Sequence, residues 1–294
     1  MNLSELADIP DISIELDKDL TNRSTMRVKA IGDLIIIRSE EALKETIKRL
    51  HERSYAYRVL GLGSNQILHP RPDYVYLKLE LPFDKKLLDS PRDNYLLPAS
   101  LPLNILTSHA IRFGLKGWES FTGIPATLGG AVFMNAGTSL GEIGALVKCV
   151  HIATTSGGQR EERISSNSFA YRKNNFLRDG EVIFKVEIRH FGVSKEISEK
   201  IKNYLVFRNH SQPLDAKTFG CMFKNPESGP AGKFIDLVGL KGFTLKDLRI
   251  SPKHGNFLEN MGEADYFDVL KVLEMVKMEL ELQYGIKFNR EVEL

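Results

Sequence analysis

Short apolar stretches along the chain predict β-strands, and the first of them leads into a helix. Leu34–Ile37 is a continuous, mostly β-branched apolar run, which favours a strand covered on both faces. Ser39 follows it as a candidate helix N-cap, and Leu43, Ile47 and Leu50 then recur at helical spacing. We therefore expect a strand followed directly by a helix in this region.

Other strands and two long helices are predicted from the same kind of pattern. The strands are expected at 27–38, as a pair around a Gly32-Asp33 turn, and at 58–60, 74–79, 151–155, 181–189 and 286–294. One helix begins at Ser194 and turns Ile197, Ile201 and Leu205 inward. Because strands and helices do not alternate regularly, we expect an α+β fold rather than a doubly wound sheet.

The other long helix is expected from Asp265, a candidate N-cap, to about Tyr284, with Gly285 as its stop. Five apolar residues spaced along this segment predict its buried stripe. They are Phe267, Leu270, Leu273, Val276 and Leu280.

Composition then narrows the class of protein. The chain has 294 residues, enough for two or three domains, and 42% hydrophobic residues, enough to fill globular cores. The 40 basic and 38 acidic residues give a net charge of +2, which argues against a dedicated nucleic-acid binder. Its N-terminal residues do not form a secretory signal, and no run approaches the roughly 18 apolar residues that a membrane helix needs.

The two cysteines, Cys149 and Cys221, cannot form a disulfide framework or a four-thiolate metal site. Reduced thiols and a cytoplasmic location are the expectation. The histidines are scattered without ligand spacing, so we expect no metal site.

Two glycine-rich segments are candidates for cofactor binding. Gly61–Asn65 follows a predicted strand, and it suits either a tight turn or a diphosphate cradle, of which the turn is the commoner. It matches neither a P-loop nor a dinucleotide fingerprint. Gly123–Gly137 is dense in small residues, which allow close approach of the backbone to an extended cofactor or to a packed helix.

Two further positions could carry chemistry. Arg172, after Tyr171, could bind a carboxylate or phosphate, or could be a solvated surface residue. Cys221 lies between glycine and apolar residues, which is compatible with a buried structural thiol, a nucleophile or a proton donor.

Taken in order along the chain, these segments resemble the UDP-N-acetylenolpyruvoylglucosamine reductase (MurB) family. The resemblance spans nearly the whole chain, and it is the ordered set rather than any one motif that is specific. The matching segments are Gly61–Asn65, Gly123-Ile124-Pro125, Gly129–Val132, Met134–Gly137, Tyr171-Arg172, Gln212-Pro213, Phe223–Pro226, Ala231–Lys233, Gly239–Gly242, Lys253-His254, Asn256-Phe257 and Glu291-Val292.

The resemblance implies an FAD-binding fold of the vanillyl-alcohol oxidase type, with two α+β subdomains and a C-terminal α+β substrate-binding domain. The expected divisions are 1–80 and 81–193 for FAD and 194–294 for the substrate. It also implies an enzyme that uses NADPH to reduce non-covalently bound FAD, which then reduces UDP-N-acetylglucosamine enolpyruvate to UDP-N-acetylmuramate for peptidoglycan. The short region after Arg172 resembles the type II branch.

The family's three catalytic positions correspond here to Arg172, Cys221 and Glu291. The middle one is a departure, because the family has a serine where this chain has Cys221. A thiol has a reference pKa of about 8.5 and is a better acid than an alcohol, so it can serve as the proton donor.

Binding residues are also implied by the resemblance. For the cofactor they are Gly61, Leu62, Gly63, Ser64, Asn65, Gly123, Ile124, Pro125, Gly129, Gly130, Asn135, Ala136, Gly137 and Val182. For the substrate they are Tyr171, Arg208, Gln212, Lys224, Asn225 and His254, each also compatible with a solvated surface role. The expected partners are the UDP-sugar and NADPH, with no nucleic acid and no membrane, and the expected state is a monomer.

Two alternatives remain open from the sequence. One is a different FAD-dependent oxidoreductase of the same fold. The other is a non-catalytic protein that binds a flavin or a nucleotide sugar. The ordered C-terminal motifs argue against the first, and retention of Arg172, Glu291 and a proton-bearing Cys221 argues against the second.

Overall fold

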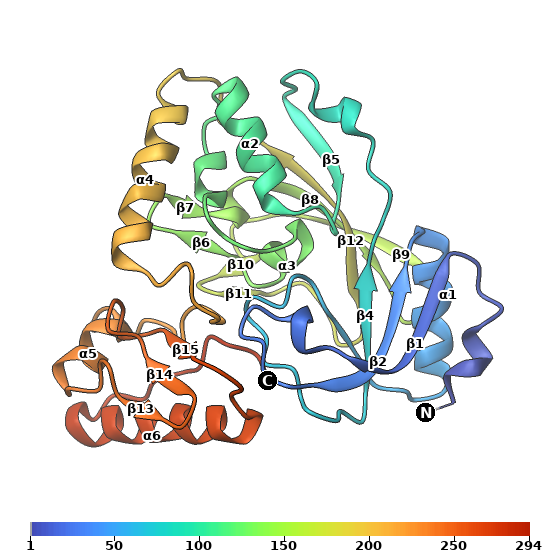
Figure 1. Cartoon of the computed structure of the whole chain (residues 1–294). Coiled ribbons are helices and arrows are strands. Elements are labelled where there is room, and N and C mark those ends of the chain that lie inside the picture. The colour runs from blue at the N-terminus through green and yellow to red at the C-terminus, as the bar shows by residue number, and fades with distance from the viewer. Residues whose placement is uncertain (1) are drawn as a thin grey trace. The chain divides into compact units, whose positions relative to one another are not determined.

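A computed structural model describes residues 2–294 (Figure 1). The chain forms two compact units. The first unit comprises residues 2–16, 33–61 and 73–205. The second comprises 17–32, 62–72 and 206–294. Each unit is therefore built from three separate pieces of chain.

A small sheet and one helix form the N-terminal part of the fold. The strands have the order β1-β2-β4-β3, and both β2 and β3 run parallel to β4. Their bounds are β1 Ile12–Asp19, β2 Ile31–Ile37, β3 Tyr57–Val59 and β4 Val75–Leu79. Helix α1, Glu40–Glu52, is capped by Ser39 and buries Leu43, Ile47 and Leu50 in one cluster with the sheet. This strand and helix were predicted and are confirmed.

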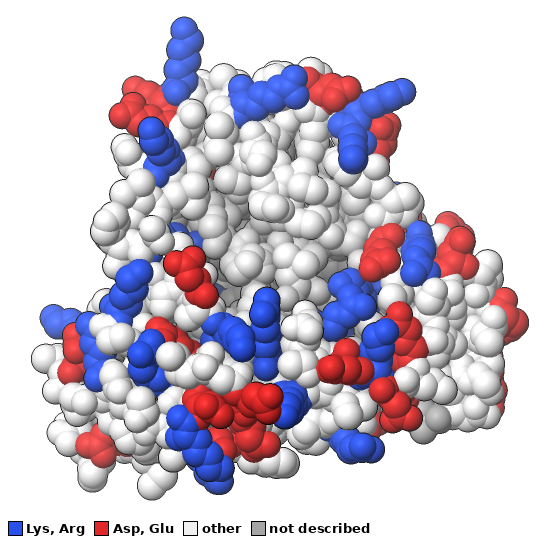
Figure 2. Space-filling model, viewed as in Figure 1, with Lys and Arg blue, Asp and Glu red and all other residues white. Residues whose placement is uncertain are grey.

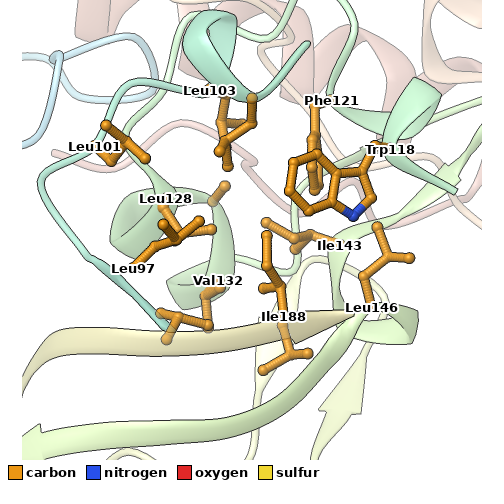
Figure 3. Close-up of a cluster of buried hydrophobic side chains, with 14 of the residues drawn as sticks. Leu97, Leu101, Leu103, Trp118, Phe121, Leu128, Val132, Ile143, Leu146 and Ile188 are labelled. Atoms are coloured by element: carbon orange, nitrogen blue, oxygen red, sulfur yellow. The ribbon is translucent and has the colours of Figure 1, made fainter. Parts of the chain in front are cut away.

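The larger sheet of the first unit is antiparallel, in the order β5-β12-β8-β9. Its strands are β5 Asn94–Pro98, β12 Val182–Arg189, β8 Val147–Ala153 and β9 Gln159–Arg163. Helices α2, Leu103–Phe113, and α3, Leu128–Phe133, contribute to its core. Figure 3 shows Trp118 and Phe121 beside aliphatic side chains from these elements. The buried indole donates to the carbonyl of Arg189 at 2.9 Å, so its polar atom is satisfied.

The chain also forms short strands, 3-10 turns and the 15-residue helix α4. They are β6 Gly137–Thr138, β7 Gly141–Glu142, β10 Phe169–Ala170, β11 Lys173–Asn174, α4 Ile197–Ser211 and the 3-10 turns Leu3–Leu6, Thr21–Arg23, Lys85–Leu88, Trp118–Phe121 and Ile143–Ala145. Strands β6 and β7 pair as one antiparallel ribbon, and β10 and β11 pair as another.

The second unit has a three-stranded antiparallel sheet and two helices. They are β13 Thr244–Leu245, β14 Leu248–Ile250, β15 Leu258–Asn260, α5 Ala231–Leu237 and α6 Tyr266–Tyr284. Met26, Val28 and Ile67 are fully or almost fully buried in the same core as α6. The N-terminal pieces thus complete this unit's hydrophobic interior.

The structure confirms the α+β class, the strands near 58–60, 74–79 and 181–189, and the long C-terminal helix with its Asp265 cap and Gly285 stop. The strand predicted at 151–155 is only partly right, because β8 begins earlier, at Val147, and ends at Ala153. The predicted turn at Gly32-Asp33 is wrong, because both residues lie inside β2. A Cβ on Gly32 would lie 3.2 Å from Leu20 and Pro72, so this glycine serves close packing.

Three details of the predicted elements also differ. Residues 286–294 form no strand, and pair only through single bridges, Phe223 with Arg290 and Gln66 with Glu293. The buried face of α6 passes through Val269 and Val272, which leaves Phe267 54% exposed. Helix α4 begins at Ile197, and its Leu205 is 39% exposed. The division at 1–80, 81–193 and 194–294 stays a prediction.

Charges of both signs are interspersed on the face displayed in Figure 2, in keeping with the net charge of +2. Within residues 2–294, no helix is both long enough and apolar enough to cross a membrane.

The cap of α6 gives a test of this fold. The Asp265 carboxylate accepts from the amides of Phe267 at 2.8 Å and Asp268 at 3.4 Å. Asp265→Ala should lower the free energy of unfolding by about 1 kcal/mol, measured by urea denaturation. The control Glu274→Ala removes an exposed carboxylate 3.8 Å from Lys277 and should cost less than about 0.5 kcal/mol. Equal losses in the two variants would contradict the capping role.

Candidate functional site

The two predicted cofactor segments meet at one side chain in the first unit. Thr127 caps α3 by accepting from the amide of Gly130 at 3.2 Å. Its hydroxyl would lie 3.3 Å from a Cβ built on Gly130 and 3.3 Å from one built on Gly61. Gly61 and Gly130, 69 positions apart in number (130 − 61), therefore lie around the same hydroxyl.

The glycines of the 123–137 segment serve different purposes. Gly129 packs against β5's end, where an added Cβ would lie 2.6 Å from the Cβ of Ala99. Its amide also donates to the Ala99 carbonyl at 2.8 Å, so helix packing explains this glycine. Gly130, in contrast, is exposed and has only Thr127 nearby. Gly123 is exposed and has a left-handed backbone, with φ of +71°. The segment thus combines packing with exposed backbone that a ligand can approach.

The other residues predicted for the cofactor in this unit lie at different depths. Pro125 is exposed, Ile124 is half-buried, and Ala136 is 5% exposed in the core of the larger sheet. Val182 is 2% exposed, and its side chain belongs to the cluster that contains α1. Asn135 is likewise buried, and its side chain is engaged with other parts of the chain.

Arg172 is held in the turn between β10 and β11. Its guanidinium donates to the carbonyl of Gly137 at 3.0 Å and to that of Asn135 at 3.4 Å. It lies 3.5 Å from the carboxylate of Glu142 and 4.9 Å from the ring centroid of Tyr171. The side chain is 15% exposed, so the predicted catalytic cation lies in a partly desolvated, fixed position.

In the second unit, the loop that follows Gly61 presents unbonded amides. Within residues 2–294, the amides of Leu62–Asn65 donate no hydrogen bond to the protein. Gly63 has φ of +63°, and a Cβ there would lie 2.3 Å from the carbonyl oxygen of Arg23. Consecutive unbonded amides in a glycine turn suit an anion such as a diphosphate. The unbonded amides therefore favour a diphosphate cradle over a purely structural turn for the segment Gly61–Asn65.

The same loop is bonded to the segment that contains Glu291. The side-chain amide of Asn65 donates to the Glu291 carbonyl at 3.1 Å, and the amide of Glu293 donates to the Asn65 carbonyl at 3.0 Å. The amide of Ile67 completes the ladder by donating to the Glu293 carbonyl at 2.9 Å. The predicted catalytic glutamate is thereby fixed next to the predicted cofactor loop.

The segment of Cys221 lies on the other side of Glu291. The amide of Glu291 donates to the carbonyl of Met222, directly after Cys221, at 2.9 Å. Cys221 is partly exposed and forms a bridge with Phe257. The buried side chain of Asn256 clamps this segment, because it accepts from the amide of Phe223 at 3.0 Å and donates to the Phe223 carbonyl at 2.7 Å. The second unit therefore brings together the loop 62–65, Cys221 and Glu291.

The residues predicted for the substrate fall into separate places. Lys224 and Asn225 continue the Cys221 segment, and the Asn225 side chain accepts from the amide of Ala231 at 2.9 Å. Arg208 and Gln212 form a pair on α4 and just beyond it, joined at 2.8 Å. Tyr171 is 45% exposed in the other unit.

His254 is half-buried beside Phe257. Burial, followed by the charge of Lys241, holds the pKa of His254 below its ordinary value. The imidazole is therefore neutral at neutral pH and can exchange hydrogen bonds with a ligand without adding charge.

Sequence reasoning did not single out Thr127, Glu142 or Asn256 as site residues. Thr127 lies within the quoted glycine-rich segment, and its position before Leu128 is an N-cap signal. Glu142 carries no such signal, because only the fold brings it to Arg172. Among residues 2–294, no group of three or more His, Cys, Asp or Glu side chains is arranged to hold a metal ion.

The first unit fixes a guanidinium and exposes glycine backbone, and the second unit holds a thiol and a carboxylate on neighbouring segments beside an open glycine turn. Each set suits anionic ligands, as in cofactor-dependent enzymes. The family model for the C-terminal domain of UDP-N-acetylenolpyruvoylglucosamine reductase matches residues 212–294. Reductases of that name from Syntrophobacter fumaroxidans and from Anaeromyxobacter sp. strain K are 31% and 34% identical to this chain. The alignments cover 98% and 95% of this chain, and 86% and 84% of those proteins.

A solved structure gives the same result. The crystal structure of UDP-N-acetylenolpyruvylglucosamine reductase (MurB) from Thermus caldophilus is 31% identical, with a TM-score of 0.79 over 96% of this chain and 98% of that one. The chain belongs to the UDP-N-acetylenolpyruvoylglucosamine reductase family, whose members are flavin-containing oxidoreductases.

The different surroundings of the two thiols lead to a prediction. Cys149 is 6% exposed in β8, and burial raises the pKa of its thiol, whereas Cys221 is partly exposed. A chromogenic disulfide reagent at pH 8 should therefore react in a fast and a slow phase, because the thiolate is the reactive form. Cys221→Ser should remove the fast phase and Cys149→Ser the slow one, with both thiols reacting quickly in denaturant. A fast phase that survives in Cys221→Ser would contradict this assignment.

Proposed function

We propose that this chain uses NADPH and bound FAD to reduce UDP-N-acetylglucosamine enolpyruvate to UDP-N-acetylmuramate, a step of peptidoglycan precursor synthesis. The observation that carries the proposal is the backbone bond from Glu291 to Met222. It holds two residues of the family's catalytic set on neighbouring segments of the second unit, although they are 70 positions apart (291 − 221).

The backbone features described above fit a non-covalently bound FAD. The amides of Leu62–Asn65 offer donors for its diphosphate, and Gly61, Gly123 and Gly130 leave the backbone open to close approach. When bound, FAD supplies hydride transfer from NADPH to the terminal vinyl carbon of the substrate. We propose that residues 1–80 and 81–193 bind FAD and that residues 194–294 bind the substrate.

Arg172 is proposed to stabilise the charge that develops on the substrate. When hydride adds to the vinyl carbon, negative charge forms on the carbon that bears the carboxylate and on its enolate oxygens. A guanidinium fixed by the carbonyls of Gly137 and Asn135 needs little reorganisation to meet that charge. Glu291 can assist if it is protonated or if it orients a donor.

Cys221 is proposed to complete the reaction by protonating the carbon next to the carboxylate. A thiol with a reference pKa of about 8.5 is mostly protonated at neutral pH, so the proton is available when the enolate forms. The resulting thiolate must recover a proton from solvent before the next cycle, which its partial exposure permits.

Substrate contacts are proposed for the six residues Tyr171, Arg208, Gln212, Lys224, Asn225 and His254. The lysine and arginine suit the diphosphate and carboxylate of the UDP-sugar, and the neutral His254 and the Asn225 amide suit its uncharged polar groups. We further propose that the enzyme acts as a monomer in the cytoplasm.

Stepwise flavin spectroscopy tests the proposal. The purified protein should show the yellow flavin absorbance, which NADPH should bleach under anaerobic conditions and the enolpyruvyl UDP-sugar should restore. Absence of flavin would favour a different protein class, and reduced flavin that ignores the substrate would favour another oxidoreductase of this fold. The substrate lacking its enolpyruvyl group serves as the control and should leave the flavin reduced.

Substitution of Cys221 tests the proton donor. Cys221→Ala should abolish reoxidation of reduced flavin by the substrate, because no proton reaches the carbanionic carbon. Cys221→Ser should retain substantial activity, and both variants should still be reduced by NADPH. The matched control Cys149→Ala changes the buried thiol of β8 and should leave the reoxidation rate unchanged. Reoxidation of Cys221→Ala at the parent rate would exclude the proposed role.

A further inference from the structure

Glu142 makes a pair of contacts that no catalytic or binding role described so far uses. It ends the short strand β7 and pairs with Gly137 of β6. One carboxylate oxygen, Oε1, lies 3.5 Å from Nη1 of Arg172. The other, Oε2, accepts from the side-chain amide of Asn135 at 2.8 Å. The two oxygens thus join the predicted catalytic cation to a buried amide.

Asn135, the residue that donates to Glu142, is itself held in place by the surrounding chain. It is 2% exposed and has a left-handed backbone with φ of +48°, which asparagine tolerates better than most residues. Its Nδ2 also donates to the carbonyl of Ala170 at 3.0 Å, and its Oδ1 accepts from the amide of Gly144 at 3.0 Å. One side chain therefore ties the strand before Arg172 to the turn after Glu142.

The contacts of Arg172, Glu142 and Asn135 form a closed ring that includes the guanidinium. Arg172 Nη1 faces both the Glu142 carboxylate and the Asn135 carbonyl, and Asn135 returns to Glu142 through its side chain. Nη2 donates to the carbonyl of Gly137, the residue that pairs with Glu142 across the ribbon. Every member of the ring is fixed by at least one contact with another member.

The backbone of Arg172 explains why such support is needed. Its φ of +54° lies in the left-handed region, which costs a long side chain about 1 kcal/mol or more. A residue keeps this conformation only where its surroundings enforce it, and such residues cluster at functional sites. If the charge of Glu142 is removed, the Arg172 guanidinium still faces two neutral carbonyls. These are the carbonyl of Gly137 at 3.0 Å and that of Asn135 at 3.4 Å.

We propose that Glu142 is a positioning residue that acts through Arg172, holding the guanidinium where the enolate charge develops. This inference rests on the proposed function, since it takes Arg172 as the group that stabilises that charge. Glu142 carries a charge opposite to that of the guanidinium, so it adds a Coulombic attraction that the neutral carbonyls of Asn135 and Gly137 do not supply.

The test follows the two half-reactions of the flavin-loaded protein in Glu142→Ala and Glu142→Gln. Reduction by NADPH should stay within about twofold of the parent, because it does not involve the enolate. The rate constant for reoxidation by the enolpyruvyl UDP-sugar should fall about tenfold or more in Glu142→Ala, equivalent to about 1.4 kcal/mol of transition-state stabilisation. Glu142→Gln keeps an acceptor for Asn135 and should lose less.

Two comparisons separate positioning from a structural role. In a double variant with Arg172→Lys, the effect of Glu142→Ala should largely disappear, since both act on one interaction. The matched control Glu187→Ala removes a half-buried carboxylate 3.1 Å from Lys148 in the same unit and should leave both half-reactions unchanged. Independent effects of Glu142 and Arg172, parent-like reoxidation of Glu142→Ala, or equal losses in flavin content and both half-reactions would overturn the inference.

Crystal structures of the parent and Glu142→Ala give a readout that does not depend on activity. The guanidinium of Arg172 should leave the carbonyls of Asn135 and Gly137 in the variant. A guanidinium that stays on both carbonyls would overturn the positioning role. If the parent flavin ignores the UDP-sugar, the proposed function fails, and the crystal structures still decide whether Glu142 positions Arg172.

Discussion

The candidate site of the second unit depends on a short segment near the C-terminus that is hydrogen-bonded on both sides. On one side, Glu291 donates through its amide to Met222. On the other, the carbonyl of Glu291 and the amide of Glu293 are bonded to Asn65. No isolated piece of the sequence contains this arrangement, because backbone hydrogen bonds and the side-chain amide of Asn65 join residues near 65, 222 and 291.

In the first unit, the packing of small residues fixes the backbone that holds Arg172. Gly129 allows α3 to approach Ala99, and this approach fixes the segment whose later residues carry the carbonyls of Asn135 and Gly137. Those carbonyls in turn hold Arg172. A core of large side chains around Trp118 and Phe121 supports the same segment from within (Figure 3). The position of a charged group thus depends on glycine packing and on a hydrophobic core.

Local patterns in the sequence were sufficient to predict most helices and strands. They were insufficient where two apolar residues could each have been buried and only tertiary packing selected one of them. The Ser39 and Asp265 caps and the Gly285 stop were predictable, because each depends on hydrogen bonds within a few residues. Which face of α6 is buried was not, since both Phe267 and Val269 are apolar and only the facing core selects Val269. Gly32 misled for a similar reason, because its neighbours Leu20 and Pro72 are distant in sequence.

The candidate site shows the same limit. Family resemblance supplied Arg172, Cys221 and Glu291, and the fold fixes the backbone around each of them. It did not supply Glu142, which is ordinary in sequence and gains its partners Asn135 and Arg172 only through the pairing of β6 with β7. Long-range contacts of this kind are not encoded in local periodicity.

The interleaved composition of the second unit has a consequence for biosynthesis. Residues 17–32 and 62–72 leave the ribosome long before 206–294, the piece whose hydrophobic side chains they join. Met26, Val28 and Ile67 must therefore stay exposed to solvent, or to chaperones, at least while the 133 residues 73–205 (205 − 72) are translated. Because Glu291 and Glu293 are translated later still, a ribosome-bound fragment can complete the core of the larger sheet while the loop 62–65 lacks its final hydrogen-bond partners. The second unit therefore completes its core only after residues 206–294 have been translated.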